Sequence, residues 1–277
     1  MPLERHPRPC RTCLTNNGEE YDVSKDQQDK GAEMAFAHRN FGVVEKAGDS
    51  NSERERMRYI RAAGLSHEAG KNILDCGCGA GKDSAFLARL GNLVAGIDIS
   101  EDAVRTAKLT ASTLGASVEF IVADTESLPF KSETFDICYC SWTLHHMPSP
   151  DKAFQQIRAI LKGGGRLTIL EPNGSNLVVK ISEHIEHLIR NWLVQIGVDT
   201  PNENLHTPRT YITSLARLGY RHPQIRLFYG TGLPPLSEAP NVISFLALAR
   251  SILLMIGRMA LPGLLGASDV IVVAEVE

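Results

Sequence analysis

The middle of the chain, from residue 72 to residue 171, alternates short apolar runs with longer amphipathic stretches. The apolar runs predict strands at 72–75, 93–98, 118–123, 135–140 and 166–171. The stretches between them carry apolar residues at helical spacing, as at Val104, Ala107 and Leu114. Strands that alternate with helices favour a parallel, doubly wound sheet, so we predict an α/β fold.

Similar patterns continue on both sides of this core. They predict helices at 31–41, 53–63, 175–196 and 208–218, and strands at 224–229 and 269–277. The helix after residue 207 has clear boundary signals, because Thr207 suits the N-cap, Pro208 the first turn and Gly219 the end. We divide the chain into an N-terminal extension (1–55), a core (56–175) and a C-terminal part of the same domain (176–277).

A glycine-rich turn follows the first core strand. Gly77, Gly79 and Gly81 stand at alternate positions, just before the next predicted helix. Glycine tolerates the positive φ of a tight turn, and its missing Cβ lets a ligand lie against the backbone. The free N–H groups at the helix start then face that ligand. A strand, a tight turn and a helix in this order form the first unit of a βαβ nucleotide site.

We compare this turn with three ligand-binding motifs. The alternative is a plain strand-to-helix turn that binds no ligand. A P-loop would need glycine at Cys76 and Ser or Thr at Asp83, which excludes it. A dinucleotide fingerprint would need its third glycine at Lys82, which disfavours an NAD-dependent oxidoreductase. The remaining pattern, Gly-x-Gly-x-Gly opened by Asp75, resembles motif I of the class I S-adenosylmethionine (SAM)-dependent methyltransferases. The acid that ends the next strand, Asp98, suits the vicinal hydroxyls of a ribose.

The resemblance covers the run from Ile73 to Glu171. This run is similar to the small-molecule class I methyltransferases, the group that includes the ubiquinone/menaquinone-biosynthesis C-methyltransferases. The features that match, in order, are the glycine loop with Asp75, the acid Asp98, Ala123-Asp124 before Leu128-Pro129-Phe130, Phe135-Asp136 with Leu144-His145-His146 after it, and Leu161-Lys162-Gly163-Gly164-Gly165. The resemblance implies a Rossmann-like, seven-stranded, mostly parallel sheet with its last strand antiparallel. A helical N-terminal extension and a helical insert before the last strand would be added to it.

The same resemblance implies that SAM is the cofactor and S-adenosylhomocysteine the product. The residues expected to bind SAM are Asp75, Gly77, Cys78, Gly79, Gly81, Asp98, Ile99, Asp124, Thr125, Cys140 and Ser141. On this interpretation the glycine loop lines the methionine end, Asp98 holds the ribose and Asp124 accepts a hydrogen bond from the adenine amino group. Asp75 and Asp98 as helix caps, and Asp124 as a loop acid, are the structural alternatives.

Methyl transfer requires little acid–base chemistry from the protein, because the sulfonium group of SAM already activates the methyl group. The protein holds donor and acceptor in line, excludes water and, for some acceptors, removes a proton. His145 and His146 follow the fourth strand at the edge where ligands bind, so they are the candidate bases, with His145 preferred. A packing role is the alternative. Further candidates from the C-terminal helices are His184, His187, His206 and Tyr211.

Composition narrows the class of protein. The chain has 277 residues, of which 43% are hydrophobic and 22% charged, as in ordinary globular proteins. The net charge of -3 and the lack of a basic patch argue against a nucleic-acid partner. The six cysteines do not resemble a disulfide framework and no signal peptide is evident, so we expect a cytoplasmic protein. Cys10 and Cys13 have half of a zinc-site spacing without a second pair, so we expect no metal.

The segment 230–267 is an apolar insert between the last two strands. Its predicted helix, 242–259, is interrupted by Arg250 and Arg258, which leaves no charge-free run long enough to span a membrane. Three interpretations stay open: an extra packed helix, a lid over an apolar acceptor, or a contact for a second copy or a membrane surface. We therefore expect methylation of a small, lipophilic biosynthetic metabolite. The alternative is a SAM-binding protein that does not transfer methyl groups.

Overall fold

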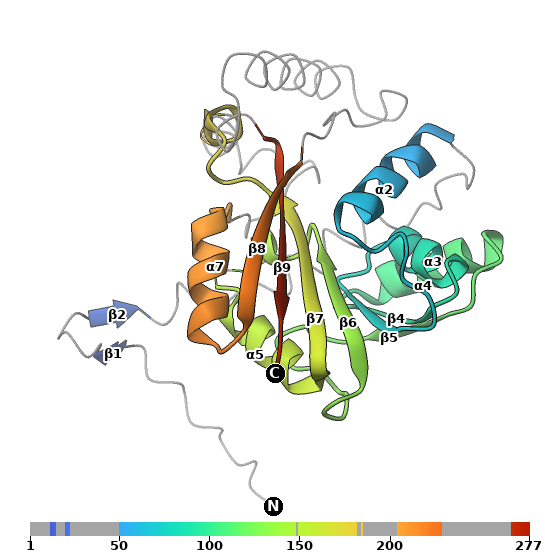
Figure 1. Cartoon of the computed structure of the whole chain (residues 1–277), viewed down its shortest axis with the longest axis horizontal. Coiled ribbons are helices and arrows are strands. Elements are labelled where there is room, and N and C mark those ends of the chain that lie inside the picture. The colour runs from blue at the N-terminus through green and yellow to red at the C-terminus, as the bar shows by residue number, and fades with distance from the viewer. Residues whose placement is uncertain are drawn as a thin grey trace, which may run out of the picture.

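The core strands form one seven-stranded sheet in the order β5-β4-β3-β6-β7-β9-β8 (Figure 1). The computed structural model describes residues 12–14, 20–22, 50–147, 149–181, 184, 204–228 and 267–277. The strands of the large sheet are β3 (Asn72–Cys76), β4 (Leu93–Asp98), β5 (Val118–Val122), β6 (Phe135–Ser141), β7 (Leu161–Pro172), β8 (Arg221–Phe228) and β9 (Asp269–Glu275). Pairs from β5 to β7 are parallel, whereas β9 runs antiparallel to both β7 and β8. The expected mostly parallel sheet with an antiparallel last strand is confirmed.

The helices whose bounds are described are α2 (Ser50–Ala62), α3 (Lys82–Arg89), α4 (Glu101–Thr113), the short 3-10 helix η2 (Leu144–His146), α5 (Asp151–Ile160) and α7 (Pro208–Arg217). Two helices have a side-chain N-cap, and the cap at Thr207 is as predicted. The Ser100 hydroxyl accepts from the Ala103 N–H at 3.3 Å, and the Thr207 hydroxyl accepts from the Thr210 N–H at 3.2 Å. Each cap supplies an acceptor to an N–H that the helix itself leaves unpaired.

Helices cover both faces of the sheet, which makes the fold doubly wound. On one face, Phe154 of α5 and Leu215 of α7 pack against alternate strand residues such as Leu74. On the other face, Ile60 of α2 and Leu87 of α3 pack against the intervening strand residues. Because successive strand side chains point to opposite faces, one apolar strand supplies both cores. The carboxyl ends of β3 to β7 are left for the connecting loops.

Some boundaries differ from the prediction. β7 begins at Leu161 rather than Arg166, because Gly164 and Gly165 exchange backbone hydrogen bonds with Val276 and so extend the ladder. β8 begins at Arg221 rather than residue 224, since Arg221 pairs with Glu275. Of the helix predicted at 175–196, residues 177–181 and 184 are described and helical. The predicted helices at 31–41 and 242–259, and most of the insert, lie outside the described residues.

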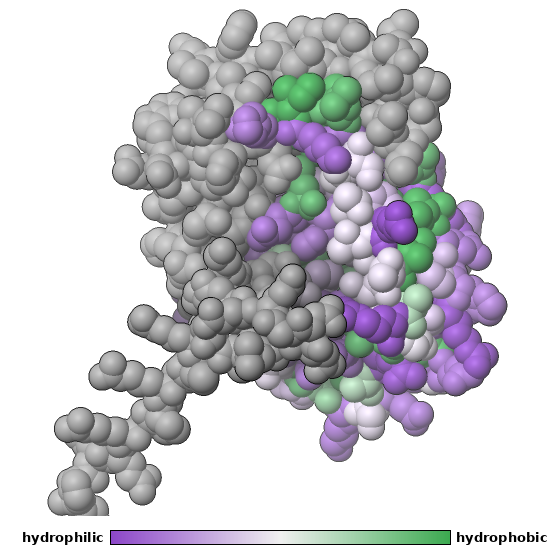
Figure 2. All heavy atoms as spheres, turned by 90° about the vertical axis from the view of Figure 1, so that its left-hand side faces the viewer, coloured by the Kyte–Doolittle hydropathy of each residue, from purple (hydrophilic) through white to green (hydrophobic). Residues whose placement is uncertain are grey.

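The N-terminal extension contains a hairpin that the pattern did not indicate, β1 (Thr12–Leu14) paired antiparallel with β2 (Glu20–Asp22). Helix α2 crosses the boundary expected at residue 55. The view in Figure 2, from the side of α7, shows hydrophilic residues interspersed with hydrophobic ones over the described surface. None of the described helices is both long and apolar enough to cross a bilayer. The described residues also hold no cluster of three or more metal-ligating side chains.

Candidate functional site

The glycine loop between β3 and α3 has the conformation that its sequence requires. Gly77, Gly79 and Gly81 have φ values of 70°, 50° and 74°, in the left-handed region that other residues avoid. Space is also limited. A Cβ at Gly77 would overlap the Thr143 hydroxyl, and one at Gly81 would lie 2.7 Å from the Ala107 Cβ. The loop therefore depends on glycine for both its turn and its packing.

A buried polar network holds the two ends of this loop together. Asp75, only 2% exposed, accepts a hydrogen bond from the Ser84 hydroxyl at 2.5 Å, which joins the end of β3 to α3. Asp83 in the first turn of α3 forms an ion pair with Arg56 of α2 at 2.7 Å. Burial, followed by the charge of Asp83, raises the pKa of Asp75 from 3.8 to about 7. Asp75 thus lies beneath the loop and links its ends.

Asp98 contacts the same loop from the end of β4. One carboxylate oxygen accepts from the Gly79 N–H at 3.0 Å and the other accepts from the Ser100 N–H at 2.9 Å. Burial raises the pKa of Asp98, although these N–H bonds oppose the shift. The residue is half-buried, so it sits between the loop and the surface.

Asp124 follows β5 beside Asp98, because the Ala123 N–H donates to the Asp98 carbonyl at 2.9 Å. Its carboxylate accepts from the Glu126 N–H at 2.9 Å. Thr125 is buried next to it, and Ile99 is half-buried after β4. These residues continue the row of loops at the carboxyl edge of the sheet.

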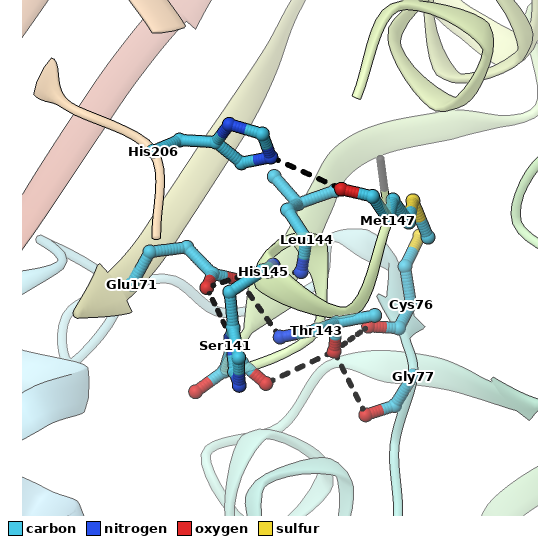
Figure 3. Close-up of polar contacts among 9 residues, drawn as sticks. All are labelled: Cys76, Gly77, Ser141, Thr143, Leu144, His145, Met147, Glu171 and His206. Carbon is cyan, nitrogen blue, oxygen red and sulfur yellow. Dashed lines mark hydrogen bonds and ion pairs between the residues drawn. The ribbon is translucent and has the colours of Figure 1, made fainter. Parts of the chain in front are cut away.

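A second polar network, centred on Glu171, lies at the ends of β6 and β7 (Figure 3). Glu171, with no exposed surface, accepts at one oxygen from the N–H groups of Thr143 and Leu144, both at 2.7 Å. Its other oxygen accepts from the His145 N–H at 3.3 Å and lies 2.6 Å from His145 Nδ1. Since an ionised carboxylate only accepts, Nδ1 is the donor in this contact. This geometry orients His145 as a candidate base.

Two histidines near His145, His146 and His206, have lowered pKa values. The rings of His146 and His145 have centroids 4.1 Å apart, and burial together with His145 lowers the pKa of His146 to about 3. His206 Nε2 donates to the Met147 carbonyl at 3.1 Å, and burial lowers its pKa. Tyr211 is fully buried, and within the described part of the chain its hydroxyl has no hydrogen-bond partner. His184 is exposed and His187 lies outside the described residues.

Comparison with known proteins agrees with this arrangement. A family model described as a methyltransferase domain matches residues 74–169. A ubiquinone biosynthesis O-methyltransferase from Coxiella burnetii is 37% identical over 98 residues, which are 35% of this chain and 42% of that protein. The match thus spans less than half of that relative. Residues 74–169 thus match a methyltransferase domain, in agreement with the predicted resemblance to the class I SAM-dependent methyltransferases. The cofactor of such a domain is SAM.

Solved structures share this fold. A geranyl diphosphate C-methyltransferase from Streptomyces coelicolor aligns with a TM-score of 0.60 and 17% identity, covering 89% of this chain and 98% of that chain. The [4+2]-cyclase SpnF aligns with a TM-score of 0.59 and 17% identity, covering 90% and 96%. At this identity the likeness concerns the fold. One fold thus supports different reactions, so the reaction must be argued from the site.

The expected SAM-binding residues of the methyltransferase domain come together along one edge of the sheet. The glycine loop, Asp98 and Asp124 follow the neighbouring strands β3, β4 and β5, and Ser141 ends β6. Cys78 and Cys140 are buried. A hydrogen bond with Cys76 and burial raise the pKa of the Cys140 thiol, so it stays neutral within the core.

Two residues of this site were missed from the sequence. Glu171 stood out there only as the end of a strand, and Thr143 was not singled out. A signal for Glu171 was present, because it is an acid at the carboxyl end of a parallel strand, as Asp75 and Asp98 are. Thr143 has no such signal, since its role depends on contacts with residues more than sixty positions earlier in the chain.

Proposed function

We propose that this protein transfers the methyl group of SAM to an oxygen of a small, lipophilic acceptor, and that His145 removes the proton from that oxygen. The observation that carries the proposal is the buried His145–Glu171 pair, with 2.6 Å between Nδ1 and the carboxylate. A hydroxyl acceptor needs a base because its neutral oxygen is a weak nucleophile. An imidazole whose Nδ1 donates to a carboxylate is held in the tautomer and orientation that a base needs.

His145 is a better base than its neighbour. His146, with a pKa of about 3, takes up almost no proton at neutral pH. A group so weakly basic gives little driving force for proton removal. The imidazole of His145, by contrast, is paired with the carboxylate of Glu171, which stabilises the protonated ring that forms when the base accepts a proton.

The residues at the sheet edge suit SAM. Gly77 and Gly79 present backbone without side chains, and Asp98 offers carboxylate oxygens to a ribose. We assign Asp124 to the adenine amino group and Ser141 to the methionine end. Bound SAM supplies the activated methyl group. The chain's own part is to orient the acceptor oxygen, exclude water and accept its proton at the His145 imidazole.

The lipophilic acceptor is supported by Trp142. This residue is 43% exposed, and its ring centroid is 6.3 Å from that of His145. An exposed aromatic surface beside the base favours an apolar molecule that carries the hydroxyl. The relative from Coxiella burnetii is named for ubiquinone biosynthesis and O-methylation, which agrees with an oxygen acceptor on an apolar compound.

The test is methyl transfer from labelled SAM to a panel of apolar phenols and alcohols, with product detected by mass spectrometry. We expect His145→Ala to lower kcat by about 10²–10⁴-fold and to leave S-adenosylhomocysteine affinity unchanged. His146→Ala is the matched control and should lose less than about tenfold. Full turnover by His145→Ala would refute the base. Cofactor binding without transfer to any acceptor would favour the SAM-binding protein that does not transfer methyl groups.

A further inference from the structure

Thr143 contacts the glycine loop through its side chain. Its hydroxyl oxygen lies 3.1 Å from the Cys76 carbonyl oxygen, 3.3 Å from that of Gly77 and 3.1 Å from that of Ser141 (Figure 3). A hydroxyl has one proton, so it donates to one of these acceptors at a time. The contact joins the start of the loop after β3 to the end of β6.

The backbone of the same residue contacts the acid–base pair. The Thr143 N–H donates to Glu171 at 2.7 Å, and the next two N–H groups donate to the same carboxylate. Glu171 in turn holds His145. One residue therefore joins the loop expected to hold the cofactor to the pair expected to remove the proton.

The local backbone is constrained so that Thr143 points in this direction. Trp142, just before it, has a φ of 54°, a strained conformation for a residue other than glycine. The Trp142 N–H donates to the Leu170 carbonyl at 2.9 Å, which fixes the strained residue to β7. The fit is close on the loop side too, because any side chain at Gly77 would overlap Thr143. Strain kept at such a point is typical of functional positions.

We infer that Thr143 is a positioning residue that sets the glycine loop and the Glu171–His145 pair relative to each other. Its hydroxyl fixes the loop and its N–H fixes the carboxylate, so the two halves of the site share one anchor. Loss of the hydroxyl should weaken cofactor binding and also disturb the His145–Glu171 hydrogen bond. The expected effect on cofactor binding rests on the proposed function. The expected effect on the His145–Glu171 hydrogen bond is tested without any ligand.

The test compares Thr143→Val, which keeps the shape, with Thr143→Ser, which keeps the hydroxyl. Calorimetric titration with S-adenosylhomocysteine should show about tenfold weaker binding for Thr143→Val, as expected for one lost hydrogen bond, and wild-type affinity for Thr143→Ser. Thr168→Val is the matched control. Thr168 is a buried threonine of β7 whose hydroxyl has no partner in the described structure. The affinity of Thr168→Val for S-adenosylhomocysteine should therefore equal that of wild type.

A second measurement follows the His145 Nδ1 proton by NMR in the ligand-free protein, with His145→Gln used to assign the signal. The signal should shift or broaden in Thr143→Val and be kept in Thr143→Ser and Thr168→Val. The inference would be overturned if Thr143→Val bound S-adenosylhomocysteine with wild-type affinity or left the His145 signal unchanged. It would also be overturned if Thr143→Ser did not keep both the affinity and the signal of wild type. If Thr143→Val does not fold, Thr143→Ala replaces it under the same criteria. If the wild type does not bind S-adenosylhomocysteine, the proposed function fails, and the NMR signal alone decides the role of Thr143.

Discussion

Asp75 is a residue whose charge state changes with folding. It is buried at the end of β3, where its carboxyl group bonds to Ser84 and interacts with the charge of Asp83. Burial removes water from the ionised form, and a second negative charge disfavours it further. The folded protein therefore holds the Asp75 proton up to a pKa of about 7, whereas an unfolded chain releases it near 3.8.

This difference makes stability depend on pH. The contribution of Asp75 is fully present below pH 3.8 and is lost as pH rises through the folded-state pKa of about 7. Asp75→Asn stays neutral, so its free energy of unfolding relative to wild type should rise by about 1.4 kcal/mol per pH unit up to that point. Urea unfolding from pH 5 to 8 measures this difference.

Asp136→Asn is the control for that experiment. Burial opposes the shift, but the Asn72 N–H and Lys162 lower the pKa of Asp136 below 3.8. A carboxyl group with a lowered pKa contributes stability that is lost only at acid pH, so this variant should run parallel to wild type from pH 5 to 8. A parallel course for Asp75→Asn as well would show that Asp75 is ionised throughout.

At the scale of residues the sequence predicts which side chains stand at strand ends, but not what they bond to. The acids Asp75 and Asp98 stand out because each follows an apolar run. The sequence predicts Asp75 at the glycine loop, but its spacing does not reveal that the Asp75 carboxyl group accepts a hydrogen bond from Ser84. The role of Glu171 depends on the loop after β6 returning to β7, a contact between residues far apart in the chain. Periodicity carries no information about such pairs.

Among the elements, the packing of α3 on α4 depends on one glycine. Gly81 is the N-cap of α3 and has a φ of 74°, and a Cβ there would lie 2.7 Å from the Ala107 Cβ and 2.8 Å from the Phe120 ring. Gly115, after α4, has a φ of 63°, but a Cβ there would meet no other atom within 4 Å. Gly81 and Gly115 both have a positive φ, but only at Gly81 would an added Cβ be crowded. A comparison of the two positions therefore separates the cost of backbone strain from the cost of overpacking.

Gly81→Ala should destabilise the fold by about 1–3 kcal/mol more than Gly115→Ala, because both variants have the strain of positive φ and only the first overpacks the core. Urea denaturation at one pH measures both variants. Equal destabilisation would mean that crowding at Gly81 relaxes without cost.

Local signals predicted the elements where they are strong. The predicted cap at Thr207 is present because it needs only a hydroxyl and a neighbouring N–H. The early start of β7 was missed because the glycine run 163–165 looks like a turn. It is drawn into the sheet by Val276 from the end of the chain, which no local pattern reveals.

For the whole molecule, the sheet order brings the candidate site together from one edge. β5, β4, β3, β6 and β7 are neighbours, so the loops that follow them converge. The C-terminal part joins this edge, since the Asn204 N–H donates to the His145 carbonyl at 2.6 Å and His206 donates to Met147. The alternating pattern and the family resemblance predicted this topology, whereas the docking of residues 204–206 on η2 was not predictable from spacing.

The most direct test of cofactor binding at this edge is calorimetric titration with S-adenosylhomocysteine, using wild type and Asp98→Ala, with NADH as the control ligand. We predict micromolar binding by wild type, binding at least about tenfold weaker by Asp98→Ala, and none of NADH. The reason is that the Asp98 carboxylate is assigned to the ribose and also fixes the loop at the Gly79 N–H. Absence of S-adenosylhomocysteine binding, or equal affinity in Asp98→Ala, would contradict this assignment.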